Sequence, residues 1–263
     1  SWEFNNYFKM KIFLVILNFM ILSNSLFARE IGETEITAEE GIEVFQDEKY
    51  YLLKKNVKIE SDNFTLIGDT VKIFFDKDLY DVTIIDARGN VNLESSQYNI
   101  KADGENLYFI LKNEEIRIEG KNSLLITSDT KMYSDGKIKV ENLDGKFDLN
   151  GPNSILESQN ILIEGENIDG IFSTNADVKE ISLLNVYDKN IAYINNGTTE
   201  MFGKKIKYNE ETSLIELEDD VKIIRDGEII TGDYGTLDTN TNSYKIKSKD
   251  AKKVIAIIKN KYE

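Results

Sequence analysis

One segment of the chain resembles the start of a calcium-binding loop. The segment DTNTNS, residues 238–243, carries oxygen-bearing side chains at alternate positions, as the first ligands of an EF-hand loop do. The pattern then fails, because Ser243 stands where the turn glycine belongs and Lys249 stands where the bidentate carboxylate belongs. The segment therefore predicts a turn between strands rather than a metal site.

Other chemistry is no better supported. The chain has no His and no Cys, which removes the commonest metal ligand, the thiol nucleophile and every His-dependent triad. The carboxylate pairs Glu210/Glu211 and Asp219/Asp220 are adjacent in sequence, so a strand would point their members to opposite faces. Nucleophile-elbow, phosphate-loop and dinucleotide motifs are absent from the sequence. We predict a protein that is not an enzyme and uses no cofactor and no metal.

The composition indicates a soluble, packed protein. With 263 residues, 41% of them hydrophobic, the chain is long enough to bury a core. Its formal net charge of −15 argues against nucleic acid as a partner, because affinity for nucleic acid rests on Lys and Arg neutralising phosphates. Solubility is the simplest consequence of such a charge.

Nearly the same sequence pattern recurs along the chain. Residues 55–75 align with residues 89–109 at an offset of 34, and residues 219–239 form a third copy. Weaker copies occupy residues 153–168 and 190–210. One position, acidic in every copy except at Lys204, marks the repeats, which are spaced by 29 to 38 residues, at Asp69, Asp103, Asp135, Glu166, Lys204 and Asp233. A period in this range indicates a repeat architecture.

Each copy has the sequence pattern of β-strands. Apolar residues alternate with polar ones, and the apolar residues are mainly Val, Ile, Tyr and Phe. Short polar links such as SDN, SSQ and RDGE fit hairpins better than parallel crossovers. We therefore predict an antiparallel meander of roughly 18 strands from Ile36 to Ile258, with one polar and one apolar face.

A small residue precedes the marker position in most copies, at Gly68, Ala102, Gly165, Gly203 and Gly232. This position predicts a bulge or tight bend that lets the sheet fold over on itself. The acidic residue that follows is expected to accept hydrogen bonds from the backbone of the bend or to face solvent.

The apolar face is the remaining candidate for a function. Large residues recur along it, which predicts a long trough between two sheets that could hold acyl chains: Phe64, Phe75, Tyr98, Phe109, Phe147, Phe172, Phe202, Tyr208 and Tyr234.

The N-terminal region has the layout of a secretory signal. Lys11 precedes an apolar stretch from Ile12 to Leu22, and small or polar residues lead to Ala28. We predict a cleaved signal peptide over residues 1–28, with Met10 as a candidate true start, and a mature chain of residues 29–263. The alternative is a retained membrane anchor, but polar residues interrupt the stretch before the roughly 20 apolar residues that a span needs.

The unit GNVxLxSxxxxIxADxxxLYF and the ending at residues 218–261 resemble the OstA-like family. That family includes the lipopolysaccharide (LPS) transport protein LptA, its relative LptC and the N-terminal part of LptD. The resemblance implies an open, twisted antiparallel β-jellyroll whose apolar interior takes lipid acyl chains. It also implies a periplasmic carrier, or bridge protein, that moves LPS or a related acylated glycolipid toward the outer membrane. The implied partners are other Lpt-type proteins and further copies of this chain, joined end to end.

Carried over by position, the resemblance assigns a lipid-binding inner face to Val57, Ile59, Leu66, Ile73, Val91, Leu93, Ile100, Leu107, Phe109, Ile163, Tyr208, Val221, Ile223 and Ile230. The closing strand would run from Lys253 to Ile258, and its alternating residues Val254, Ala256 and Ile258 would form an oligomer edge. The mature chain is longer than a typical LptA. It therefore forms either one long roll or two halves, residues 29–140 and 141–263.

Three other hypotheses stay open from the sequence. A membrane-anchored, LptC-like subunit would use residues 12–28 as its helix. A structural surface repeat would carry no lipid. A polysaccharide-cleaving parallel β-helix would also repeat with Asp residues, but the tight hairpin link RDGE argues against it.

Overall fold

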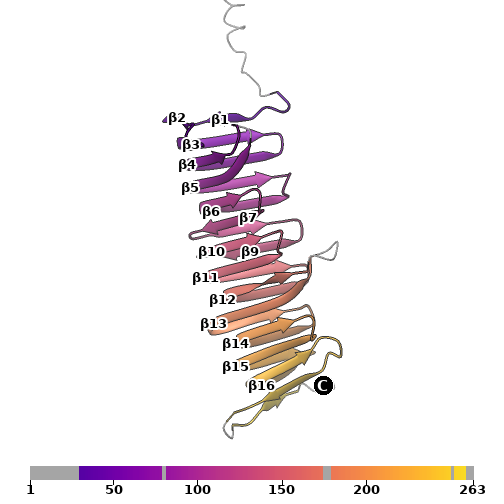
Figure 1. The fold of residues 1–263 in the computed structure, drawn as a ribbon. Helices are drawn as coiled ribbons and strands as arrows, with labels where there is room; N and C mark the ends of the chain where they lie inside the picture. The colour runs from indigo at the N-terminus through magenta and orange to yellow at the C-terminus, as the bar shows by residue number, and fades with distance from the viewer. Residues whose placement is uncertain (1–29, 79–80, 174–178, 250–251, 259–263) are drawn as a thin grey trace, which may run out of the picture.

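The described part of the fold is built from strands alone. The computed structural model describes residues 30–78, 81–173, 179–249 and 252–258, and these ranges contain no helix. Eighteen strands join into one antiparallel sheet (Figure 1). The all-β, antiparallel prediction is confirmed. The predicted signal peptide, residues 1–28, lies outside the described residues.

Ten strands are long: β3 (Tyr50–Ser61), β4 (Phe64–Phe75), β5 (Val82–Ser95), β6 (Ile100–Ile110), β11 (Lys146–Ser158), β12 (Ile161–Phe172), β13 (Ile181–Asn195), β14 (Thr199–Asn209), β15 (Leu214–Arg225) and β16 (Glu228–Asp238). The short strands are β1 (Glu35–Thr37), β2 (Gly41–Phe45), β7 (Glu115–Glu119), β8 (Ser123–Ile126), β9 (Thr130–Ser134), β10 (Lys137–Glu141), β17 (Tyr244–Lys247) and β18 (Ile255–Ile257).

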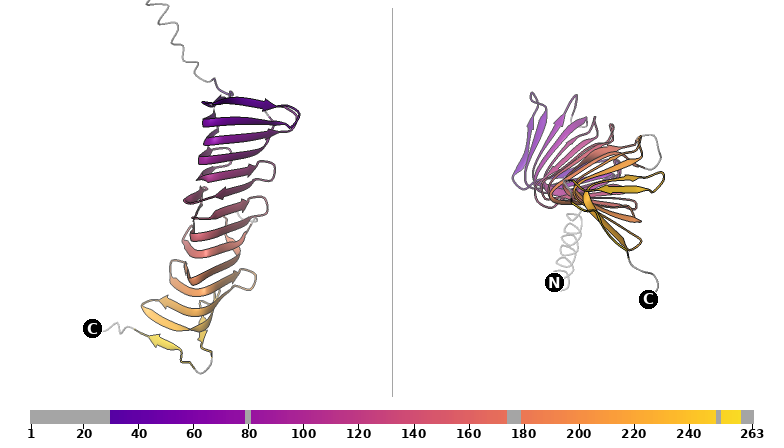
Figure 2. Two further views of the ribbon diagram at one scale, coloured as in Figure 1. Left: turned by 90° about the vertical axis from the view of Figure 1, so that its left-hand side faces the viewer. Right: turned by 90° about the horizontal axis from the view of Figure 1, so that it is seen from below.

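Each long strand bends near its middle, so the sheet folds over into two layers. Layer A contains β2, β7, β10, β17 and the halves of the long strands that pair with them. Layer B contains β1, β8, β9, β18 and the other halves. Viewed end-on, the folded sheet twists steadily along its length (Figure 2). The fold is thus an open, twisted antiparallel β-jellyroll, and its ladder passes through residues 140 and 141 within β10.

The bends use two kinds of backbone. In β3, Lys55 and Asn56 have φ of 64° and 48°, and in β15, Asp219 and Asp220 have φ of 60° and 56°. Asn and Asp tolerate this left-handed region better than most residues. The other kind is a register shift next to a glycine, as at Gly203 in β14. The predicted bends are therefore present at the glycines of this position, whereas in β6 the register shifts next to Gly104 rather than at Ala102.

The acidic residues at the bends tie neighbouring strands together. Exposed Asp69 accepts a hydrogen bond from the side-chain amide of Asn90 at 3.1 Å. Asp103 accepts one from the Asn92 amide at 2.6 Å. These donors are side chains, whereas the expected backbone donors occur elsewhere along the bend.

Asp135 has the most complete set of donors. It accepts hydrogen bonds from the Asn122 backbone N–H at 3.0 Å, the Tyr133 hydroxyl at 2.7 Å and the Asn153 amide at 2.7 Å. Hydrogen bonds from the Asn153 amide and then the Tyr133 hydroxyl lower the pKa of this carboxyl. Because the pKa is lowered, the stabilisation is present above the unfolded-state pKa and is lost as the pH falls through the folded-state pKa.

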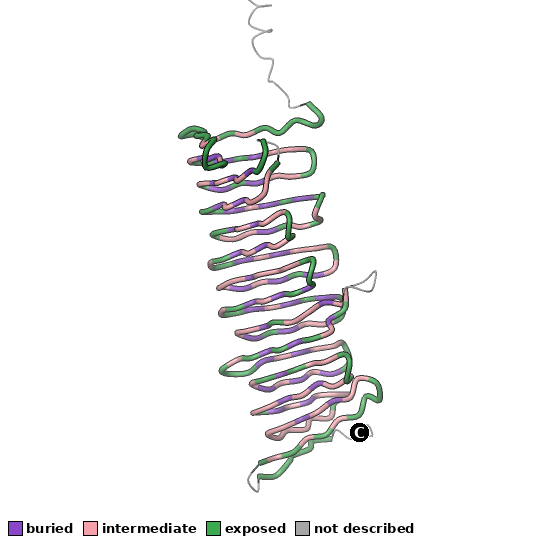
Figure 3. Tube along the Cα trace, in the orientation of Figure 1, coloured by how far each residue is buried: buried purple, intermediate pink, exposed green. Residues whose placement is uncertain are grey.

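The core lies between the two layers and runs along the whole sheet (Figure 3). The inner faces of both layers supply side chains that are sealed from solvent, such as Leu53 and Leu107 in layer A and Leu66 and Leu93 in layer B. Burying a side chain of this size stabilises the fold by about 1.5–3 kcal/mol.

Replacing Gly136 by Ala should destabilise the fold by about 1–3 kcal/mol, the usual range for overpacking. A Cβ at Gly136 would lie 2.2 Å from the Asn150 carbonyl oxygen and 2.9 Å from the Gly151 Cα, so backbone would have to move. Gly68→Ala is the matched control, since its nearest neighbour would lie at 3.4 Å. That control should change the free energy of unfolding by less than about 1 kcal/mol. Urea denaturation measures both, and equal midpoints would contradict the expected close approach.

Candidate lipid-binding groove

The two layers are joined along the bends, and hairpin turns line the opposite edge in two rows. The layer A row contains turns at residues 46–49, 111–114, 142–145 and 210–213. The layer B row contains turns at residues 62–63, 96–99, 127–129, 159–160 and 196–198. The space between these rows, which we call the mouth, is where the apolar interior reaches solvent.

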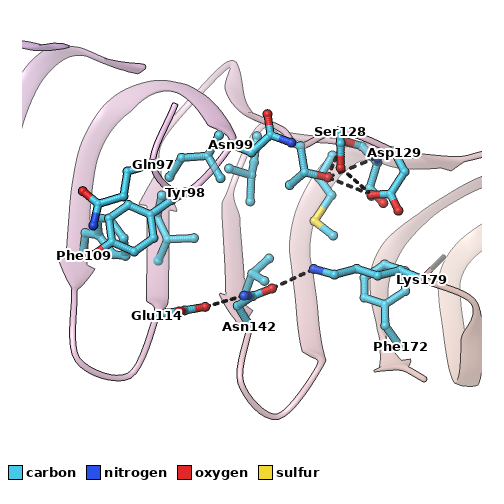
Figure 4. A pocket seen from close by; sticks show the side chains of 17 residues that line it. Gln97, Tyr98, Asn99, Phe109, Glu114, Ser128, Asp129, Asn142, Phe172 and Lys179 are labelled. Carbon is cyan, nitrogen blue, oxygen red and sulfur yellow. Dashed lines mark hydrogen bonds between the residues drawn. The ribbon is translucent and has the colours of Figure 1, made fainter. Parts of the chain in front are cut away.

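Two cavities lie in the mouth. Cavity 1, of 260 Å³, is bounded inside by Ile100, Phe109, Ile116, Leu125 and Met132, which come from both layers (Figure 4). Cavity 2, of 250 Å³, is bounded inside by Ile161, Ile181, Leu184, Ile194 and Met201. Each cavity therefore has an apolar floor and a rim made of turn residues.

The rim of cavity 1 contains a short chain of hydrogen bonds. The Lys179 ammonium donates to the Asn142 side-chain oxygen at 2.7 Å, and the Asn142 amide donates to the Glu114 carboxylate (Figure 4). Lys179 also lines cavity 2. This lysine therefore stands at the point where the two cavities approach each other.

Cavity 2 has a tyrosine at its edge. Burial raises the pKa of Tyr208, and the carboxylate of Glu210 acts in the same direction. The hydroxyl therefore stays neutral at physiological pH and presents a polar group beside an apolar floor.

The predicted lipid-binding residues all lie on the inner faces of the layers. All except Ile100, Tyr208 and Ile230 are buried, and Ile230 shares its face with its partner Ile223. Ile100 and Phe109 line cavity 1, and Tyr208 lines cavity 2. Apart from Ile230, the remaining predicted residues form a closed core rather than an open trough in this structure.

Two of the large residues expected on the apolar face lie on the outer face instead. Phe202 stacks under the Lys222 ammonium, 4.2 Å from its ring centre, and the Tyr234 hydroxyl donates to Glu216 at 3.2 Å. The reason is the bulge at the neighbouring glycine. In β14 the inward positions are Met201 and Gly203 before the bulge and Ile206 after it, so the alternation changes phase.

Other residues of cavity 1 were not predicted. Met132 belongs to the segment at residues 123–140, which fits the repeat only loosely, and Asn142 and Lys179 belong to links between strands. Alternation could not identify Asn142 and Lys179, because links have no period. Their only signal was their position between consecutive strands.

The sequence matches the family described as LptA/(LptD N-terminal domain) LPS transport protein over residues 35–169, just over half of the chain. The chain belongs to this family. The OstA-like resemblance is therefore confirmed, and the protein takes part in LPS transport. The family is one of transport proteins rather than enzymes.

Sixteen solved chains match this LPS transport protein, among them one periplasmic component. It is LptH, described as the LptA homologous periplasmic component of the conserved lipopolysaccharide transport device from Pseudomonas aeruginosa. The likeness covers 87% of this chain and 96% of that chain, with 10% identity and a TM-score of 0.22. No curated protein matches the sequence.

Within the described residues, the two ends of the sheet in this LPS transport protein are open edges. The closing strand β18 spans Ile255–Ile257, which is shorter than the predicted run from Lys253 to Ile258. Ala256 pairs with Ile230, while Val254 and Ile258 are 43% and 66% exposed. At the other end, Ile42 and Val44 of β2 are 47% and 44% exposed.

The calcium-like segment forms a turn. The Asp238 carboxylate accepts hydrogen bonds from the backbone N–H groups of Asn240 at 2.8 Å and Thr241 at 3.1 Å. Among the described residues, no three His, Cys, Asp or Glu side chains gather as a metal site would require. In the same part of the chain, no helix has the length and hydropathy to span a membrane.

Proposed function

We propose that the protein is a periplasmic carrier that binds LPS, or a related acylated glycolipid, between its two layers and passes it toward the outer membrane. The observation that carries this proposal is an apolar interior that runs along the whole sheet and reaches solvent at the mouth. Membership of an LPS transport family supports the same lipid. Each buried CH₂ of an acyl chain would contribute about 0.8 kcal/mol.

The cavities are small for this task. Their volumes of 260 and 250 Å³ lie below the roughly 300–1,000 Å³ of typical ligand pockets. We therefore expect the turn rows to move apart when lipid enters, with the layers pivoting along the bends. Hydrogen bonds such as Asp69 to Asn90 hold neighbouring strands together there.

A photo-crosslinking amino acid tests the site. Placed at Ile100, on the rim of cavity 1, it should capture LPS in cells, because acyl chains would pass this residue on entry. Placed at Asn92, which follows a buried residue and faces outward, it should capture none. Capture at Asn92 but not at Ile100 would refute binding between the layers.

A second candidate function is that of a membrane-anchored LptC-like subunit. The apolar stretch at residues 12–22 favours this alternative. N-terminal sequencing of the exported protein separates the two. A chain that begins near Arg29 supports the free carrier, and a chain that retains the stretch supports the anchored subunit. In either case, we expect one roll rather than two, because the strand ladder continues through residues 140 and 141.

A further inference from the structure

The rims of the two cavities carry an unusual balance of charge. Glu114 and Asp129 line cavity 1, Glu180 and Glu210 line cavity 2, and Lys179 is the one cation among the described lining residues. Within the described residues, none of these four carboxylates forms an ion pair with Lys or Arg. The mouth is therefore acidic around a single positive group.

The Lys179 ammonium group has more hydrogen-bond donors than its contact with Asn142 uses. Its ammonium group has three N–H donors, and the structure assigns one of them to the Asn142 oxygen at 2.7 Å. Asn142 is held in place by its own hydrogen bonds to Glu114, from the side chain and from the backbone N–H at 3.1 Å. The half-buried Lys179 thus points toward Asn142 (Figure 4) and lines both cavities.

The surrounding carboxylates limit what this lysine can hold. Glu114 and Asp129 are half-buried beside an apolar floor, and low-dielectric walls strengthen the field of charges in a cleft. One anionic group can be paired with Lys179. A second anionic group on the same ligand would meet a carboxylate with no cation to compensate it, and such like-charge contacts reduce affinity.

We propose that the mouth selects an acylated glycolipid whose head group carries one anionic group, a phosphate or a carboxylate, which Lys179 binds at the junction of the cavities. The proposal rests on the proposed function and specifies the lipid class within it. Neither cavity alone is large enough for a whole lipid, so its chains would lie in both cavities with the head group between them.

The test measures equilibrium binding of the full chain to monophosphoryl and diphosphoryl lipid A with matched acyl chains at low salt. The monophosphoryl lipid should bind roughly fivefold more tightly or better, since like charges are costly at a weakly screened site. Lys179→Gln should lower its affinity about tenfold, the equivalent of one hydrogen bond to a charged group. Lys207→Gln, on an exposed outer position, removes the same charge and should have no effect.

The double variant Asp129→Asn/Glu210→Gln gives an opposite readout, because it should raise the affinity for the diphosphoryl lipid. A merely structural role for these residues would not produce that gain. A palmitate-modified sugar with one carboxylate instead of phosphate should bind Lys179 in the same way, and binding of the phosphate lipid alone would restrict the site to phosphate. Equal or tighter binding of the diphosphoryl lipid, with or without Mg²⁺, overturns the head-group proposal alone. No binding of any acylated lipid overturns the proposed function as well.

Discussion

Replacing Leu66 by Asp should prevent stable folding, whereas replacing its neighbour Ile67 by Asp should be tolerated. Leu66 is 0% exposed, and its cross-strand partners Ile59 and Leu93 are also buried. An unpaired carboxylate there costs several kcal/mol, a large part of the 5–15 kcal/mol that stabilises a typical domain. Ile67 is 42% exposed and lies between Lys58 and Asn92, so an Asp at this position stays hydrated.

Circular dichroism and urea denaturation of the two purified variants check this expectation. Ile67→Asp should change the free energy of unfolding by less than about 1 kcal/mol, as surface substitutions usually do. Leu66→Asp should be recovered mainly as unfolded or aggregated protein. Similar stability of the two variants would show that the assignment of inner and outer faces in β4 is wrong.

Ala256→Pro should abolish end-to-end association of the protein. Unpaired strand edges pair readily with another chain, and both ends of this sheet are open. Each end also offers one edge strand in each layer, β1 and β2 at one end and β17 and β18 at the other. Exposed apolar residues at both ends, including Val44 and Ile258, would continue the core across such a junction. Proline in β18 removes a ladder donor and fixes φ.

The two edges differ in charge, which favours pairing of unlike ends into an open chain rather than a closed dimer. The first edge carries Glu35 and Glu43, and the last carries Lys245 and Lys247. Light scattering should therefore show oligomers that grow with concentration and weaken with salt. Lys247→Glu should lower the association constant about tenfold, while Lys207→Glu, away from either edge, should not. A monomer at high concentration, or normal assembly of both edge variants, would refute the bridge role.

Much of the fold could be predicted from local sequence patterns. Alternation of apolar residues determines the strands, because successive side chains of a strand point to opposite faces. The polar links SDN, SSQ and RDGE specify hairpins, and the recurring glycine specifies the bend. For the same reason, the inner-face positions of Val91, Leu93, Val221 and Ile223 could be predicted without coordinates.

Alternation was not sufficient across a bend. The bulges at Gly203 and Gly232 shift the phase, so Phe202 and Tyr234 lie on the outer face, although Phe202 matches the inward spacing of the half-strand after its bulge and Tyr234 that of the half-strand before its bulge. A bulge adds one residue to one strand only. Its effect on the alternation of inward and outward side chains depends on how the partner strand pairs with the residues on either side of the bulge. That geometry is a property of the pair of strands.

The tertiary structure alone decided the character of the candidate site. Whether two apolar faces close into a core or leave a trough depends on side-chain volumes across the layers, which the pattern within one strand does not contain. The mouth gathers Asp129, Asn142 and Lys179 from three separate links between strands, and stacking of successive hairpins along the sheet brings those links together. The sequence thus determined which residues face inward within each half-strand, while the packing of the two layers determined where the interior opens and which charges surround that opening.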